Sequence, residues 1–396
     1  MKKIITFLAF AACNYMFGQT YSFDPTFGSA GVKTQQQAGF LPTDGMLIGN
    51  SYYFIFDTGF VKMAYDGSLD ASFGTNGTLP LNAGISTSTI SGFKFIEGYF
   101  YVYGSADGNG FIYKVDTNGN FDSGFGTNGL AIADFGATEK LADLVQDANG
   151  NLLCIGSRAE DDASNRLIYF KTSLATGAIN TSFDANGYKI YNEITPSIGK
   201  SIQKIEGDFL LLGAASTNAL VFKIDANGNP VNSFGPNGSK FFPMPTPGME
   251  ITGMQVHDND IYVKYYWGWS FISQGTNLVK FNLTTGEQIF DVGSYRTTYF
   301  KVMDDGIYIT GTEYCNYAYN PYGCARPYSL RKLHFDGTPD TDFQNGGTFN
   351  YSFYPSADSR SSVFIKDGNG KILIGGILSG SPLSNVPGGS TFIRLG

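Results

Sequence analysis

The chain has 396 residues, a formal net charge of −8 and only 15% charged side chains, against roughly 25% in ordinary globular chains. Its 51 Gly, 34 Phe and 25 Tyr predict many tight turns and many aromatic strands. The basic residues are scattered along the chain, so the positive stripe that would neutralise a phosphate backbone is missing and nucleic acid is not expected as a partner.

Residues 1–18 have the composition of an export signal. Two lysines precede an apolar run that ends at Cys13, and this run is shorter than the roughly 20 residues that span a bilayer. We expect residues 1–18 to be a signal peptide and the protein to be secreted, periplasmic or associated with the outer membrane. Ala11, Ala12 and Cys13 also match the end of a lipobox, so a lipoprotein modified at Cys13 is the alternative. No other stretch is apolar enough to predict an integral membrane protein.

One phrase recurs along the rest of the chain: a Gly turn, an Asp or Asn, then Ser-Phe or Thr-Phe, then Gly and usually Asn-Gly. Its copies are FDPTFGSAG (23–31), DGSLDASFGTNG (66–77), NGNFDSGFGTNG (118–129), TGAINTSFDANG (176–187), NGNPVNSFGPNG (227–238), TGEQIFDVG (285–293) and DGTPDTDFQNGG (336–347). The aromatic residues of the copies are Phe27, Phe73, Phe125, Phe183, Phe234, Phe290 and Phe343, spaced 46 to 58 residues apart. Seven units of about 50 residues are what an array of four-stranded blades requires.

Each unit holds further short apolar strands joined by tight turns. Segments 141–146 and 151–156 flank the turn at 147–150, where an Asn followed by Gly supplies the positive φ angles of a short hairpin. A third strand precedes the next copy of the phrase, as at 111–114, and a fourth follows it, as at 188–191. We therefore predict an all-β fold, a seven-bladed β-propeller of four-stranded blades.

The two ends of the chain predict how the ring closes. The last strand, at 391–395, matches the third strand of a unit, so the last unit lacks its fourth strand. The N-terminal strand, at about 21–36, is expected to supply it and to cover two edges that would otherwise invite aggregation. Residues 19–396 then form a single domain, with an open right-handed superhelix as the alternative. Blade five is expected to be irregular, because the copy at 285–293 lacks Asn-Gly.

The phrase D-x-S-F-G-x-N-G resembles the delta-60 repeat of bacterial exported and surface proteins. The resemblance is strongest at 70–77, 122–129 and 232–238, and it covers nearly the whole chain after residue 18. It implies a propeller-like repeat and a location in the cell envelope. It carries no established chemistry, so it implies no catalytic residue.

Cysteines and histidines give little sign of chemistry. Cys315 and Cys324 bracket a short aromatic insert, and in an oxidising compartment we expect a disulfide that stabilises the fold by about 2 to 3 kcal/mol. Cys154 lies in an apolar strand and is expected to be a buried, unreactive thiol. His257 and His334, the only histidines, each adjoin a predicted turn and are expected at the surface.

No metal or other cofactor is expected, with calcium as the alternative. Turns at 116–120, 147–151, 225–229 and 367–370 begin like a calcium loop, yet none has the bidentate Glu that closes an EF-hand. Hairpin turn chemistry explains them equally well. The acidic loop at 160–162 is a further candidate.

Aromatic residues gather in two loops that are predicted to lie on one face of the ring, between the second and third strands of blades five and six. The candidate ligand-binding residues are Tyr265, Tyr266, Trp267 and Trp269 in blade five, and Tyr317, Tyr319, Tyr322 and Arg326 in or beside the insert of blade six. Exposed Trp and Tyr are typical contact residues. The alternative is that these aromatics only continue a strand or pack on each other.

The predicted function is that of a non-catalytic binding or scaffold propeller, a monomer, which holds a glycan or a protein on this rim. The alternative is a carbohydrate-active hydrolase or lyase with acidic residues in the central pocket. Its paired carboxylates would lie about 5 to 9.5 Å apart, and the sequence marks no particular pair.

Overall fold

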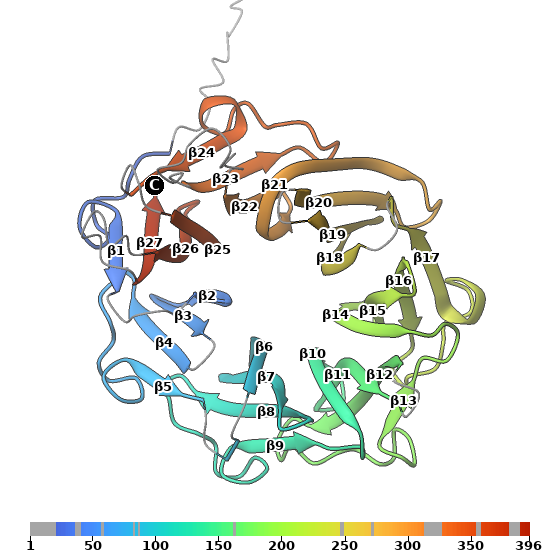
Figure 1. Ribbon diagram of the computed structural model, residues 1–396. Coiled ribbons are helices and arrows are strands. Elements are labelled where there is room, and N and C mark those ends of the chain that lie inside the picture. The colour runs from blue at the N-terminus through green and yellow to red at the C-terminus, as the bar shows by residue number, and fades with distance from the viewer. Residues whose placement is uncertain are drawn as a thin grey trace, which may run out of the picture.

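A computed structural model describes the chain at residues 21–35, 41–56, 59–81, 84–85, 88–160, 164–245, 249–270, 273–312, 327–353, 358–379 and 389–396. Seven antiparallel blades surround a central axis (Figure 1). Two short 3-10 turns, η1 (Pro236–Gly238) and η2 (Asn345–Gly347), are the only helical elements in these ranges. The predicted all-β, seven-bladed propeller is confirmed.

The first four blades are separate four-stranded sheets, and in each the first strand lies nearest the axis (Figure 1). Blade one comprises β2 (Asp44–Ile48), β3 (Ser51–Phe56), β4 (Gly59–Ala64) and β5 (Thr78–Pro80). Blade two comprises β6 (Ser88–Ile96), β7 (Tyr99–Ala106), β8 (Asn109–Asp116) and β9 (Leu130–Ala133). Blade three comprises β10 (Thr138–Gln146), β11 (Asn151–Ala159), β12 (Asn165–Ser173) and β13 (Tyr188–Ile190). Blade four comprises β14 (Ser197–Ile205), β15 (Asp208–Ala215), β16 (Asn218–Ile224) and β17 (Ser239–Pro243).

Blades five and six are fused into one seven-stranded sheet. Its strands are β18 (Glu250–His257), β19 (Asp260–Ser270), β20 (Ser273–Asn282), β21 (Gln288–Met303), β22 (Gly306–Thr312), β23 (Tyr328–Leu333) and β24 (Thr348–Tyr351). β21 pairs with β20 up to Tyr295 and with β22 from Arg296 onward. One continuous strand is therefore the outermost strand of blade five and the innermost strand of blade six, which is the expected irregularity of blade five.

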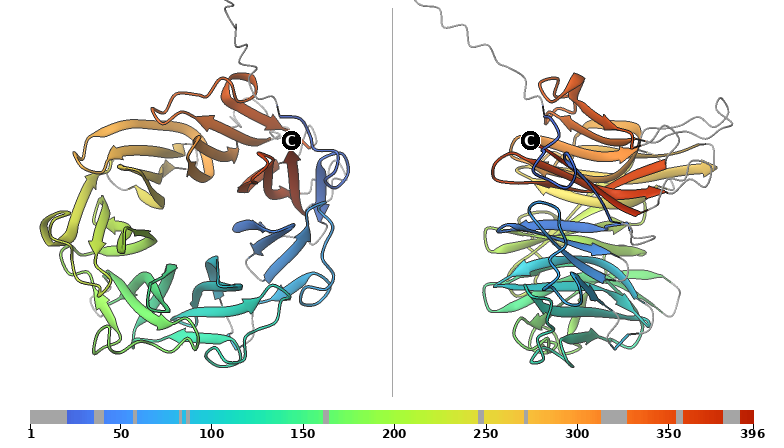
Figure 2. Two further views of the ribbon diagram at one scale, coloured as in Figure 1. Left: turned by 180° about the vertical axis from the view of Figure 1, so that it is seen from behind. Right: turned by 90° about the vertical axis from the view of Figure 1, so that its left-hand side faces the viewer.

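Blade seven is built from both ends of the chain. It consists of β25 (Asp358–Lys366), β26 (Ile372–Ser379), β27 (Gly389–Leu395) and the N-terminal β1 (Val32–Gln35). β1 pairs antiparallel with β27, from Val32 opposite Ile393 to Gln35 opposite Ser390. Figure 2 shows the blue N-terminal segment beside the red C-terminal strands. The predicted closure is confirmed, and the superhelix is excluded.

The aromatic residue of the repeat is buried in four copies and half-buried in the other three, at Phe183, Phe234 and Phe290. Phe27, Phe73 and Phe125 are 0% exposed, and burying one such side chain contributes about 1.5 to 3 kcal/mol. The ring of Phe73 lies 5.5 Å from that of Phe60 in its own blade, and Phe60 lies 4.8 Å from Phe100 in the next blade. Facing sheets are thus joined by edge-to-face aromatic pairs.

In three copies of the repeat, a lysine of the third strand holds the turn that follows it. Lys62, Lys114 and Lys332 each lie 2.8 Å from the aspartate eight residues further on. The backbone carbonyl of each lysine also accepts a hydrogen bond from the amide of that aspartate. Strand and turn are therefore held together twice, once through the side chains and once through the backbone.

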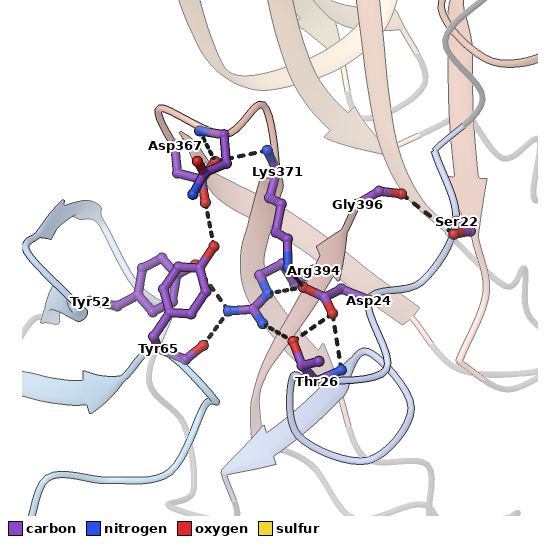
Figure 3. A network of polar contacts seen from close by, with 10 residues as sticks. Ser22, Asp24, Thr26, Tyr52, Tyr65, Asp367, Lys371, Arg394 and Gly396 are labelled. Carbon is purple, nitrogen blue, oxygen red and sulfur yellow. Dashed lines mark hydrogen bonds and ion pairs between the residues drawn. The ribbon is translucent and has the colours of Figure 1, made fainter.

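A corresponding arrangement, with Arg394 in place of the lysine, joins the two ends of the chain (Figure 3). Arg394, which is 0% exposed, donates from Nε to Oδ2 of Asp24 at 2.8 Å. The amide of Asp24 donates to the carbonyl of Arg394 at 2.9 Å. The guanidinium lies 4.1 Å from the ring centroid of Tyr65 in blade one. We call Asp24 and Arg394 the closure pair.

Candidate functional site

The β19–β20 hairpin places aromatic residues at the end of the fused sheet. Tyr266 is 38% exposed and pairs with Thr276 across the hairpin. Trp267 is half-buried and lies over Gly275, where a Cβ atom would approach the indole to 2.7 Å. The indole Nε1 donates to Oδ1 of Asn277 at 2.9 Å. The glycine thus provides the space that the indole occupies.

Tyr265 is directed into the blade and is 1% exposed. Its hydroxyl donates to Oδ2 of Asp291 at 2.6 Å, and Oδ1 of Asp291 accepts a hydrogen bond from Asn277 at 2.9 Å. Burial and the Asp291 carboxylate raise the pKa of Tyr265. Tyr265 and Trp267 lie on the same side of the strand, because alternate side chains share a face, and both pack in one cluster. Tyr265 is buried and closed to a ligand, which corrects its prediction as a contact residue.

The structure does not describe the side chains of the remaining predicted rim residues. Trp269 belongs to β19, and its side chain is not among those described. Tyr317, Tyr319, Tyr322, Arg326, Cys315 and Cys324 all lie in the undescribed segment 313–326. That segment follows β22 and precedes β23, the second and third strands of blade six, just as the hairpin turn follows β19.

A second site lies on the axis, where a cavity of about 390 Å³ opens between the inner strands of blades two to six. Its lining includes Lys94, Asp143, Gln203, Lys264 and Lys301. Ser201, Thr252, Gly253, Gln255, Tyr299 and neighbouring apolar residues complete it.

β-Bulges aim side chains into this cavity. The inner strands shift register immediately before Asp143, Ser201, Gly253 and Tyr299. A bulge inserts one residue and turns the following side chain to a new direction. Four cavity-lining residues therefore follow the same local irregularity, for which the sequence carries no evident signal.

Asp143 is held by several donors. Its Oδ1 accepts from the Tyr103 hydroxyl at 2.8 Å and from the Leu144 amide at 2.9 Å. Its Oδ2 accepts from the Ser201 hydroxyl and from the Ile202 amide, both at 3.1 Å. Lys94 Nζ lies 3.1 Å from Oδ1. The carboxylate therefore bridges blades two, three and four.

The turns that resemble calcium loops use their carboxylates internally. Asp116, Asp147, Asp225 and Asp367 each accept hydrogen bonds at Oδ1 from the backbone amides two and four residues further on. Glu160 is paired with Arg158 at 2.7 Å, and 161–163 lie outside the described residues. Within the described ranges, no three His, Cys, Asp or Glu side chains are gathered closely enough to hold a metal ion.

Cys154 and His334 occupy their predicted places, whereas the side chain of His257, predicted at the surface, is only 19% exposed. His257 ends β18 and stacks on Phe335 with ring centroids 5.5 Å apart, and its Nε2 lies 3.4 Å from Asp304. The side chain of His334, directly after β23, is 55% exposed. Cys154 is a buried free thiol, and burial raises its pKa. None of the three faces the axial cavity.

Comparison with known proteins supports the fold alone. Neither a protein-family model nor a curated protein sequence matches the chain. The WD40 domain of Pan2 from Neurospora crassa superposes with a TM-score of 0.50 at 8% identity, over 92% of this chain and 93% of that domain. The extracellular domain of BT4673 from B. thetaiotaomicron gives a TM-score of 0.45 at 10% identity, over 91% of this chain and 39% of the other. In the part of the chain described here, no helix is long and apolar enough to span a membrane.

Proposed function

We propose that this protein is a non-catalytic binding or scaffold propeller that holds a glycan or a protein partner on the rim of blades five and six. The observation that supports it is the fixed position of Trp267 at the end of the fused sheet. Its indole packs over Gly275 and is hydrogen-bonded to Asn277. An indole fixed in this way loses little conformational entropy when a sugar ring or an apolar side chain stacks on it.

The fused sheet gives this rim a rigid base. Because β21 belongs to both blades, the hairpin of blade five and the strands of blade six share a continuous set of backbone hydrogen bonds. Tyr266 is exposed on the same hairpin, on the opposite side of the strand from Trp267. Aromatic residues on a rigid base are typical of binding hot spots.

A glycan array tests this function. The protein lacking residues 1–18 is compared with a Trp267→Ala variant and with a Phe241→Ala control, since Phe241 is 37% exposed on β17, outside the proposed rim. We expect binding by the parent and the control, and loss of binding by Trp267→Ala at comparable thermal stability. Glycan binding that survives Trp267→Ala would show that the binding site is not on the rim. Absence of binding by all three forms would contradict a glycan as the ligand.

The axial cavity gives little support to the alternative function, that of a hydrolase or lyase. A hydrolase or lyase needs carboxylates that are free to face a substrate. Asp143, the carboxylate among the described lining residues, accepts four hydrogen bonds and an ion pair from the protein itself. Its arrangement is that of a structural bridge.

We also propose that the protein is exported, on the evidence of residues 1–18. Mass spectrometry of the protein from its native cells tests this. An N-terminus at Gln19 would indicate a soluble exported protein, a lipid-modified Cys13 would indicate a lipoprotein, and an intact Met1 would contradict export.

A further inference from the structure

The lysines of the third strands and those of the axial cavity differ in their partners. On the third strands, Lys62, Lys114, Lys171, Lys223, Lys280 and Lys332 each have an aspartate within 3.0 Å. At the axis, Lys264 and Lys301 form no ion pair with any residue in the described ranges. Lys189, Lys200 and Lys240 are also half-buried without an ion pair to the described residues, but Lys264 and Lys301 line the same cavity.

Lys264 reaches the cavity from the second strand of blade five. Its side chain passes over Gly253, where a Cβ would lie 3.5 Å from its Cε. Its Nζ donates to the carbonyl of Thr298 at 2.7 Å, which uses one of its three protons. Burial lowers the pKa of Lys264 to about 8, since no nearby carboxylate compensates the loss of water.

The other polar groups of the cavity complete a positive site. Lys94, Lys264 and Lys301 bring three positive charges to this cavity. They are opposed by the carboxylate of Asp143 and by the nearby Asp44 carboxyl, whose pKa burial raises to about 6 and which interacts with Lys94 and Lys301. Tyr299 lines the same cavity and is half-buried, and no described residue bonds its hydroxyl. This is a local excess of positive charge in a chain whose net charge is −8.

The base of the cavity is rigid because two glutamines join neighbouring blades. Gln203 Nε2 donates to the carbonyl of Val256 at 2.9 Å, and Gln255 Nε2 donates to that of Val302 at 2.8 Å. Each side-chain carbonyl also accepts a hydrogen bond from the amide of the same partner residue. The inner strands cannot move apart without breaking these pairs, so the lysines are held in place before any ligand arrives.

We infer that the axial cavity binds a doubly charged phosphate-type oxyanion, free or carried as a phosphomonoester on a small molecule. Lys264 and Lys301 donate charge-assisted hydrogen bonds to its oxygens, and Tyr299 adds a neutral donor. The cavity volume of about 390 Å³ lies in the range of small-ligand sites. This site is separate from the rim and does not depend on the proposed rim function.

Thermal unfolding in the presence of inorganic phosphate tests the inference, with ionic strength held constant by sodium chloride. A ligand that binds only the folded state raises the unfolding temperature in a saturable way. We expect this rise for the parent protein, and an apparent Kd about tenfold weaker or more in Lys264→Gln and in Lys301→Gln. Lys204→Gln, an exposed inner-strand lysine outside the cavity lining, is the matched control and keeps the parent Kd.

Glucose 6-phosphate, tested in the same way, distinguishes the source of the oxyanion. A tighter Kd than that of phosphate assigns the site to a phosphorylated small molecule, and an equal or weaker Kd assigns it to free phosphate. The inference is overturned if neither compound raises the unfolding temperature, or if Lys204→Gln weakens binding as much as Lys301→Gln does. The side chain of Lys301 forms no hydrogen bond or close ion pair with the described residues, and it interacts with the Asp44 carboxyl only at longer range. Its replacement therefore tests the site without removing a direct side-chain contact.

Discussion

Individual side chains in this protein take their roles from the face of the strand on which they lie. One Phe marks each copy of the repeat, and Phe27, Phe73 and Phe125 are completely buried. Tyr265 and Tyr266 are neighbours of one type, yet the first is buried and the second exposed. Sequence cannot decide this where a strand is aromatic on both faces, because the alternation of apolar and polar residues that assigns faces is absent.

Loss of the closure pair should destabilise the ring. In Asp24→Asn the guanidinium of Arg394, which is 0% exposed, loses the carboxylate that neutralises it. Breaking a buried ion pair from one side costs about 3 to 5 kcal/mol, so we expect a loss of about 3 kcal/mol in the free energy of unfolding, measured with urea. Asp70→Asn, whose partner Lys62 is partly exposed, should lose clearly less, and equal losses would contradict a special role for closure.

The same carboxylates predict a decline of stability in acid. Hydrogen bonds from Lys62 and Ser72 lower the pKa of Asp70 to about 2, and similar contacts lower the pKa of Asp24, Asp122 and Asp340. A carboxyl whose pKa is lower when folded stabilises the protein above its unfolded pKa of about 3.9 and loses that contribution as pH falls through the folded value. Stability to urea should therefore fall between about pH 4 and pH 2, and a constant stability across that interval would contradict it.

At the scale of strands, the turns were predictable and the shared strand was not. Asn-Gly and Asp-containing turns mark the ends of strands in most units, and the strands lie where those turns place them. The copy at 285–293 lacks Asn-Gly, and its strand continues into the next blade as β21. A spacing of eight residues between Lys and Asp, as in Lys114 and Asp122, also marks a copy of the repeat. This signal was recognised only from the ion pairs in the structure.

The support beneath Trp267 can be tested from β21. A Cβ at Gly293 would lie 2.3 Å from Oδ1 of Asn277, so Gly293→Ala must displace the amide that accepts the indole hydrogen bond. We expect the tryptophan emission spectrum to shift while the thermal unfolding remains cooperative. Gly368→Ala, at a position with open space, should leave the emission unchanged. An unchanged spectrum in Gly293→Ala would show that Asn277 does not hold the indole.

For the whole molecule, the number of blades and their closure followed from counting repeats, but the axial site did not. Lys94, Asp143, Lys264 and Lys301 come from four different blades, and they are far apart in the sequence. Only the closed ring brings them to one cavity. The rim could be proposed earlier because each of its loops is contiguous in the sequence, so an excess of aromatic residues is visible without knowledge of the fold.

Tryptophan fluorescence provides the most direct measurement of binding at the rim, because Trp267 and Trp269 are the only tryptophans of the chain. Titration with a glycan selected on the array should change the emission in a saturable way, with the Kd found by calorimetry. Inorganic phosphate, bound at the axis, should leave the emission unchanged. A glycan that binds by calorimetry but does not alter the emission would contradict the account, because its site would then lie away from the rim of blades five and six.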